Sequence, residues 1–229
     1  MILIDDIIGL FFPRICTACE AVLLKNEETI CTRCLFTLPR TNFHLHSENP
    51  VTELFWGRVP LQSATAYLYF AKAGRVQHLI HQFKYKGNLE AGRLLGKMYG
   101  NDLHRSELFA GVEAIVPVPL HWSKQKARGF NQSEVFGREM ASAMNVPLLT
   151  DILFREKATA TQTRKSRFDR WQNVSYVFNL TNPDKIAGKH ILLVDDVVTT
   201  GATIEASASV LLAVPGVKIS LAFLAMAAH

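Results

Sequence analysis

The sequence predicts an α/β fold with a mainly parallel central sheet flanked by helices, preceded by a small module built on cysteines. Short apolar stretches alternate with longer stretches of helical periodicity after Ser63, which is typical of βαβ units. All four cysteines lie near the amino terminus, and hydrophobic residues make up 48% of the 229 residues, enough for a substantial core. We expect a zinc-ribbon module with an apolar helix over 1–40, a linker over 41–62 and the main domain over 63–229.

The charge and hydropathy pattern favours a protein that stays outside membranes. The net charge of +5 permits phosphate or nucleic-acid partners without selecting one, because lysine and arginine are spread along the chain. No apolar run approaches the roughly 18 residues needed to cross a bilayer. Asp5 and Asp6 lie where a signal peptide would carry basic residues. We therefore predict a cytoplasmic protein whose first residues form a short apolar helix face: Ile2, Leu3, Ile7, Ile8, Leu10 and Phe11.

The cysteines form two CxxC pairs, CTAC and CTRC, separated by eleven residues. Two such pairs can present four thiolates to one tetrahedral metal, and this spacing indicates a structural zinc site without an open coordination position. Disulfides are disfavoured in a reducing compartment. Four free thiols and a rubredoxin-like iron site remain alternatives. The predicted ligands are Cys16, Cys19, Cys31 and Cys34.

Periodicity and turn residues place the elements of the main domain. The stretch ATAYLYF after Ser63 is a strand, and the region before it carries scattered prolines and glycine that indicate irregular structure. The remaining expected strands are 113–118, a short one within 151–155, 189–194 and 217–227. The expected helices are 76–83, 89–103, 132–144 and 202–214.

The stretch ILLVDDVVTTGAT, residues 191–203, is the strongest candidate for a ligand site. Its first four residues do not alternate with polar ones, which predicts a central parallel strand covered on both faces. We expect the chain to leave the strand after Val194 and to begin a helix near Gly201. Ligands of open parallel sheets bind at the carboxyl ends of strands, so this turn is placed to bind one.

The turn combines two kinds of chemistry. Free backbone N–H groups at a helix start attract an anion, and the hydroxyls of Thr199, Thr200 and Thr203 add donors beside the small Gly201 and Ala202. The adjacent acids would repel a phosphate and should face sugar hydroxyls or a cation. A magnesium-binding Walker B strand is excluded because the chain has no GxxxxGK[ST] loop. The remaining alternative is an ordinary helix start capped by Thr199 or Thr200.

The sequence VDDVVTTGAT resembles the PRPP-binding signature of type I phosphoribosyltransferases. The resemblance implies that Asp195 and Asp196, also the candidate catalytic residues, contact the ribose hydroxyls of phosphoribosyl pyrophosphate. It implies that the following loop holds the 5′-phosphate. The full set of implied PRPP-binding residues is Asp195, Asp196, Val197, Val198, Thr199, Thr200, Gly201, Ala202 and Thr203.

Together with the paired cysteines, further motifs are similar to the ComF family, which is associated with natural competence and is amidophosphoribosyltransferase-like. These motifs are FKYKG at 83–87, PVPLHWSKQKARGFNQ at 117–132, Gln162 and RFDRWQNV at 167–174. The second of them suits a pyrophosphate loop, in which the planar fork of an arginine grips phosphate oxygens. A solvated basic turn is the alternative. The residues assigned to this loop are Pro119, Lys126, Arg128 and Gly129, and Asn131 is the expected cap of the next helix.

The basic segment 155–170 lacks apolar periodicity and is expected to be an exposed loop. It could close over bound PRPP as a hood, or contact single-stranded DNA with Phe168 and Trp171 stacking on bases. A surface loop without a ligand is equally consistent with it. Its candidate contacts are Arg164, Lys165, Arg167 and Arg170, whereas His78 and His81 are assigned to surface or packing roles.

These observations predict a PRPP-binding protein that transfers a phosphoribosyl group to an unidentified acceptor, with Mg²⁺ accompanying PRPP and zinc stabilising the amino-terminal module. The first cysteine, Cys16, belongs to a metal-type pair, so glutamine hydrolysis by an amino-terminal cysteine is not expected. The alternatives are a non-catalytic competence factor that handles single-stranded DNA, with DNA or competence proteins as partners, and a PRPP-sensing regulator. The sequence does not indicate an oligomeric state.

Overall fold

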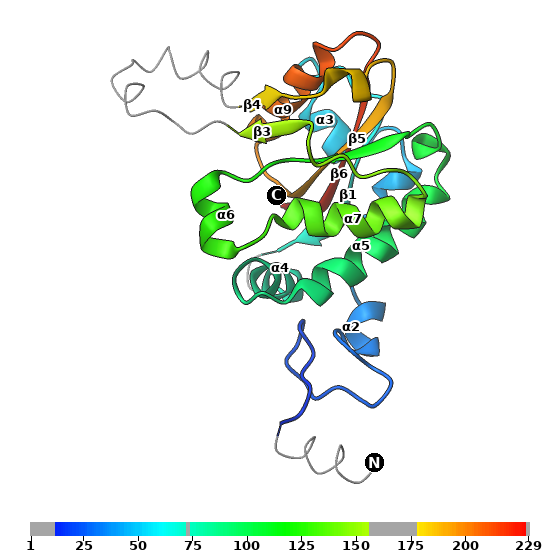
Figure 1. Cartoon of the computed structure of the whole chain (residues 1–229). Helices are drawn as coiled ribbons and strands as arrows, with labels where there is room; N and C mark the ends of the chain where they lie inside the picture. Colours follow the sequence, from blue (N-terminus) through cyan, green and yellow to red (C-terminus); the bar gives the residue numbers. More distant parts are fainter. Residues whose placement is uncertain (1–11, 72–73, 156–177, 228–229) are drawn as a thin grey trace.

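The computed structural model describes residues 12–71, 74–155 and 178–227 (Figure 1). Before the sheet come α2 (Thr32–Phe36), η1 (Phe43–Leu45) and α3 (Pro50–Leu54). The main domain continues with β1 (Ala64–Phe70), α4 (Arg75–Tyr85), α5 (Leu89–His104), η2 (Glu107–Phe109), β2 (Ala114–Pro117), α6 (Trp122–Arg128), α7 (Gln132–Met144) and β3 (Leu153–Arg155). It ends with β4 (Phe178–Leu180), η4 (Pro183–Lys185), β5 (His190–Val198), α9 (Ala202–Leu212) and β6 (Lys218–Ala227).

The central sheet has the strand order β1-β6-β5-β2, and every neighbouring pair is parallel. The predicted α/β class with a mainly parallel sheet is therefore confirmed. In the middle strands, residues 191–194 of β5 and 219–226 of β6 are buried without interruption, as the apolar run at 191–194 predicts. The short strands β3 and β4 form a separate antiparallel pair at one side.

Helices cover both faces of the sheet. Alternate residues along β5 belong to different cores: Leu192 and Val194 pack with α4, α5 and α7, whereas Ile191 and Leu193 pack with α3 and α9. The amino-terminal module projects beyond α4 and α5 (Figure 1). In open parallel sheets, ligands bind at the carboxyl edge of the strands.

Two glycines set the close packing of α5 on α7. A Cβ on Gly96 would lie 2.5 Å from the carbonyl oxygen of Phe136, and one on Gly100 would lie 2.8 Å from the Cα of Met140. Such distances leave no space for a side chain, so only glycine allows the two helix backbones to approach this closely. This contact fixes the amino-terminal end of α7 next to the carboxyl end of β5.

The interval 41–62, predicted as an irregular linker, contains η1 and α3, which is a correction to that expectation. Phe43, Val51 and Phe55 are buried against the sheet, and the side chain of Asn49 caps α3 by accepting hydrogen bonds from the backbone N–H groups of Val51 and Thr52. Burial of these apolar side chains offsets the cost of ordering a short segment that periodicity alone does not reveal. The domain boundaries themselves stay a prediction.

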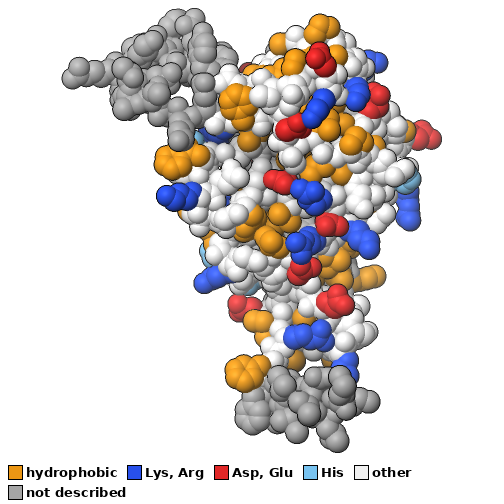
Figure 2. All heavy atoms as spheres, in the orientation of Figure 1, with side chains coloured by type: hydrophobic (Ala, Val, Ile, Leu, Met, Phe, Trp, Pro, Cys, Tyr) orange, Lys and Arg blue, Asp and Glu red, His pale blue; other side chains and the backbone are white. Residues whose placement is uncertain are grey.

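The surface in the view of Figure 2 carries acidic and basic side chains interspersed with one another rather than a field of a single sign. Among the described residues, no helix is both long and apolar enough to span a bilayer. The amino-terminal apolar helix face predicted for residues 2–11 lies outside the described residues.

Candidate functional site

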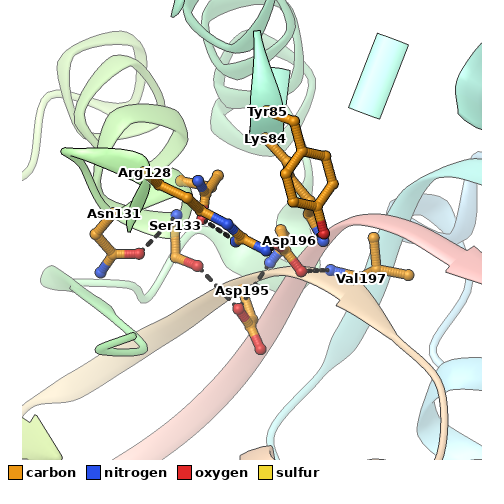
Figure 3. A network of polar contacts seen from close by, with 9 residues as sticks. Lys84, Tyr85, Arg128, Asn131, Ser133, Asp195, Asp196 and Val197 are labelled. Atoms are coloured by element: carbon orange, nitrogen blue, oxygen red, sulfur yellow. Dashed lines mark hydrogen bonds and ion pairs between the residues drawn. The ribbon is translucent and has the colours of Figure 1, made fainter. Parts of the chain in front are cut away.

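The two adjacent acids lie at the carboxyl end of β5 and are held by different partners (Figure 3). The Oδ1 atom of Asp195 accepts hydrogen bonds from the hydroxyl of Ser133, at the start of α7, and from the backbone N–H of Asp196, both at 2.8 Å. These two donors fix the orientation of the carboxylate. Asp195 is thus a pre-positioned hydrogen-bond acceptor at the edge of the sheet.

Burial and, secondarily, the negative charge of Asp196 raise the pKa of Asp195 from 3.8 to about 7. The hydrogen bonds from the Asp196 backbone and from Ser133, together with the charge of Lys84, oppose this rise. The protonation of this carboxyl therefore changes near neutral pH. Strongly perturbed carboxyls at a strand end are typical of functional sites.

Asp196 is bound by a lysine from another element. Its Oδ2 atom lies 2.6 Å from the Nζ of Lys84 on α4, and its Oδ1 atom accepts the backbone N–H of Val197 at 2.6 Å. The side chains of Lys84 and Asp196 are only 17% and 15% exposed. An ion pair that is this well shielded from water orients both groups more strongly than a surface pair does.

The turn from β5 to α9 has the geometry of an anion site. Thr199 and Thr200 are exposed, and Gly201 adopts the left-handed conformation with φ of +78° as the N-cap of α9. Glycine provides no capping side chain, so the N–H groups of the first helical turn donate no hydrogen bond to a side chain of their N-cap. These donors and the positive end of the helix dipole favour a bound phosphate.

Arg128 lies on the α6 side of the same region, at the carboxyl end of that helix. Its guanidinium donates to Oε1 of Gln132 at 2.8 Å and to the hydroxyl of Tyr85 at 3.2 Å, and its Cζ lies 4.9 Å from the centre of the Tyr85 ring. Gly129 then reverses the chain with φ of +80°. These contacts hold a planar cation beside the acid pair, where it can meet an anionic ligand.

The four cysteines converge in the amino-terminal module. Their Sγ atoms all lie within 4.8 Å of one another, and the sulfurs of Cys19 and Cys31 are 3.8 Å apart. Two thiolates bound to one tetrahedral zinc at ~2.3 Å would be separated by a similar distance, ~3.8 Å. The donor set therefore fits a metal such as zinc, and all four thiols are free, which disagrees with the disulfide alternative.

Backbone N–H groups surround these sulfurs. Ala18 and Cys31 donate to the sulfur of Cys16 at 3.4 and 3.2 Å, and Cys34 donates to the sulfur of Cys31 at 3.4 Å. Burial acts to raise the pKa of the Cys16 thiol, but the donated hydrogen bonds outweigh it and lower the pKa to about 7. The thiolate of Cys16 is therefore stabilised, whereas burial raises the pKa of the Cys31 and Cys34 thiols. A bound cation would favour the thiolate form of all four.

Comparison with known proteins places the chain among competence-associated relatives. A family model described as "Phosphoribosyl transferase domain" matches residues 131–229. Competence protein F of Haemophilus influenzae is 34% identical over 131 residues, covering 56% of this chain and 57% of that protein. The DNA utilization protein YhgH of Escherichia coli K12 is 30% identical over 201 residues, covering 86% of this chain and 84% of that protein.

The chain belongs to the ComF family of phosphoribosyltransferase-like proteins. Another relative, competence protein ComFC of Bacillus subtilis, is 25% identical over 206 residues, covering 83% of this chain and 80% of that protein. Among solved structures, the glutamine PRPP amidotransferase from B. subtilis is 17% identical, covers 62% of this chain and 30% of that chain, and has a TM-score of 0.42. The match to the Haemophilus protein leaves more than two fifths of its length unmatched.

In this ComF-family chain, most sequence-predicted residues of the PRPP motif lie together, but one local expectation is wrong. The strand does not end at Val194, because β5 continues through both acids to Val198 and pairs with β6 as far as Met226. The helix begins at its N-cap Gly201, as expected, and the alternative of a threonine cap is wrong. Continued parallel pairing makes the acids part of a rigid strand, which positions them more precisely than a loop would.

The predicted pyrophosphate loop is also more ordered than expected. Residues 122–128 form the helix α6, which periodicity did not indicate because it carries no buried residue. Asn131 caps α7 through Ser133, as predicted. Pro119 lies between β2 and α6, and Lys126 is exposed on α6.

Three residues at the acid pair were missed as site residues. Lys84 stands within the quoted motif FKYKG, and Ser133 follows the predicted cap, yet neither spacing nor composition connects them to β5. Arg155, on β3, also lies near Asp195. Burial lowers the pKa of Arg155, and the negative charge of Asp195 opposes this lowering. The predicted hood or nucleic-acid contacts, Arg164, Lys165, Arg167 and Arg170, lie outside the described residues.

Proposed function

We propose that this ComF-family protein binds PRPP at the carboxyl end of β5 and transfers its phosphoribosyl group to an acceptor, releasing pyrophosphate. The observation that carries the proposal is the direct succession of two pre-oriented acids and a glycine-capped helix start. The acids supply acceptors for hydroxyl groups, and the helix start supplies donors for a phosphate. A ribose phosphate carries both groups on one molecule.

Each part of PRPP has a matching group in the proposed site. The carboxylates of Asp195 and Asp196 accept hydrogen bonds from the ribose 2′- and 3′-hydroxyls, and the turn from Thr199 through Thr203 holds the 5′-phosphate. Pro119, Lys126, Arg128 and Gly129 form the pyrophosphate side, in which the fork of Arg128 binds oxygens. Mg²⁺, when bound together with PRPP, would neutralise charge on the pyrophosphate.

The protein residues stabilise the charge that develops in the transfer. A nucleophile forms a bond to C1 of the ribose while the bond from C1 to the pyrophosphate oxygen breaks, and the electron pair leaves with pyrophosphate. The sugar then resembles an oxocarbenium ion, which nearby carboxylates stabilise. The ion pair with Lys84 keeps Asp196 oriented during this step, so less reorganisation is needed.

The names of the relatives support a connection with DNA uptake, and zinc in the four-cysteine module would stabilise the fold without taking part in the reaction. A second candidate function is a non-catalytic factor that binds single-stranded DNA or senses PRPP. The mixed charges on the face in Figure 2 do not form a continuous basic track there, which favours the small-molecule site. Loss of salt-dependent single-stranded DNA binding on changing Arg164, Lys165 and Arg167 to alanine would favour the DNA-binding alternative.

Calorimetry with Mg²⁺ and PRPP tests the binding proposal. The wild-type protein should bind, and the double variant Asp195→Ala/Asp196→Ala should lose at least about tenfold in affinity because two charge-assisted hydrogen bonds to sugar hydroxyls are removed. Asp184→Ala, an exposed acid on η4, is the matched control and should bind like wild type. Absence of binding by wild type, or unchanged affinity of the double variant, would contradict the proposal.

A further inference from the structure

The segment 50–58, which comprises α3 and the residues that follow it, packs against the turn from β5 to α9 (Figure 1). The buried ring of Phe55 lies so close to Gly201 that a Cβ on this glycine would come within 2.6 Å of it. The same ring lies parallel to that of Phe223 on β6, with centroids 6.4 Å apart and planes 4° apart. Phe223 is the register partner of Asp195 in the sheet. The turn therefore packs on an aromatic pair that is anchored beside the acids.

The side chain of Arg58 connects this segment to both the turn and the helix. Its Nη1 donates to the carbonyl oxygens of Leu54 and Thr200, both at 3.0 Å. Its Nε and Nη2 donate to the Oε2 of Glu205 at 3.1 and 2.5 Å. One planar guanidinium thus bridges the end of α3, the turn and the first turn of α9. A lysine ammonium lacks the rigid fork that makes this set of contacts.

The contact with Thr200 fixes the orientation of the peptide group between Thr200 and Gly201. A trans peptide is planar, and its C=O and N–H point in opposite directions. Because the carbonyl oxygen of Thr200 points to Arg58, the N–H of Gly201 points away from Arg58. A carbonyl turned the other way would present a negative dipole end to a phosphate in the turn, whereas an N–H there can donate to it.

Arg58 also compensates an unfavourable charge. Glu205 lies in the first turn of α9, where a carboxylate competes with a bound anion for the positive end of the helix. The side chains of Arg58 and Glu205 are 33% and 36% exposed. An ion pair that is this exposed contributes little to stability. Its effect on the charge and geometry of the turn accounts better for the arrangement.

We propose that Arg58 is a positioning residue for the phosphate turn, defined here as residues 199–203. Through the carbonyl oxygen of Thr200, it holds the N–H of Gly201 in the orientation that receives the 5′-phosphate of PRPP, before the ligand arrives. Binding then loses less free energy to ordering of the turn. This inference rests on the proposed function above, and it gives the interval predicted as a linker a role in the site.

NMR of the full chain without ligand tests the orientation directly. Arg58→Met should shift the ¹⁵N and ¹H resonances of the Gly201 amide, because the peptide group loses its anchor. Arg93→Met is the matched control: it removes an exposed arginine that is paired with Glu90 on α5, and it should leave the Gly201 amide unchanged. An unchanged Gly201 amide in Arg58→Met would overturn the proposal.

Calorimetry with Mg²⁺ and PRPP separates orientation from charge. Arg58→Met should weaken PRPP binding by about tenfold, and Arg93→Met should bind like wild type. The double variant Arg58→Met/Glu205→Gln removes the uncompensated carboxylate but does not restore the anchor, so it should remain weak. Recovery of wild-type affinity in the double variant would show that Arg58 only neutralises Glu205 and would overturn the positioning role.

The two measurements also distinguish this inference from the proposed function. If wild type does not bind PRPP, the proposed function has failed, and the Gly201 amide still reports whether Arg58 orients the turn. If wild type binds PRPP and Arg58→Met binds it equally well, only the role of Arg58 has failed.

Discussion

Replacing Asp195 by asparagine should stabilise the protein at neutral and alkaline pH. The asparagine side chain keeps the oxygen that accepts hydrogen bonds from Ser133 and from the Asp196 backbone, but it removes a buried charge beside another carboxylate. Removing a charge that burial and its neighbour both disfavour lowers the free energy of the folded state. Stability gained this way would come with loss of the proposed ribose contact.

The size of the effect follows from the pKa. Burial, followed by the charge of Asp196, raises the pKa of Asp195 from 3.8 to about 7, which corresponds to at most about 4 kcal/mol. Because relaxation and nearby water reduce the penalty, we expect a gain of about 2 to 4 kcal/mol at pH 8.5. The folded state binds the extra proton between these pKa values. In wild type, the protonated Asp195 therefore contributes stability that is fully present below pH 3.8. This contribution is lost as the pH rises through about 7.

Urea unfolding followed by circular dichroism at several pH values measures this gain. The difference in free energy of unfolding between Asp195→Asn and wild type should grow from pH 4 to pH 7 and then level off. Asp151→Asn is the control, because the hydrogen bond from Lys185 lowers the pKa of that exposed carboxyl and its removal should give no gain at high pH. A gain independent of pH, or a loss of stability at pH 8.5, would refute this account of Asp195.

Other changes test the remaining contacts. Lys84→Met should raise the pKa of Asp195, measured by carboxyl ¹³C NMR without ligand, and should reduce PRPP affinity at pH 7. The control Lys86→Met, at an exposed position, should change neither quantity. Tighter PRPP binding by Lys84→Met would show that the ion pair competes with the ligand. Chelation should release one metal ion per chain from the four-cysteine module and make the module more sensitive to proteolysis. If the metal is released and the proteolysis does not change, the metal has no structural role. Gly201→Ala should lower stability by about 1–2 kcal/mol or more in thermal unfolding, because φ is +78° and a Cβ would lie 2.6 Å from the ring of Phe55; an unchanged transition would contradict this.

Much of the fold could be predicted from the sequence because its strongest signals are local. The strand Ala64–Phe70 and the helix Gln132–Met144 have the predicted bounds, because their periodicity and capping residues depend only on residues that are neighbours in the sequence. The helices α3 and α6 were missed for the opposite reason. The helix α3 is short and is stabilised by burial against residues distant in the sequence, and α6 buries no side chain. Neither helix therefore carries an amphipathic pattern.

The candidate site divides in the same way. The acids and the turn after them are contiguous, so spacing alone indicates their chemistry. Lys84, Ser133 and Arg155 come from three other elements, and only the packing of α4, α7 and β3 around the end of β5 brings them to the acids. Sequence spacing does not report such contacts. It also did not reveal that β5 extends through the acids, because the two carboxylates interrupt its apolar pattern.

A crystal structure of the protein with Mg²⁺ and PRPP tests the central claim most directly. The account predicts the ribose 2′- and 3′-hydroxyls within hydrogen-bond distance of the carboxylates of Asp195 and Asp196. It also predicts the 5′-phosphate on the backbone N–H groups at the start of α9. A ligand bound through its phosphates elsewhere, with the acid pair and the turn before α9 free of it, would contradict the account.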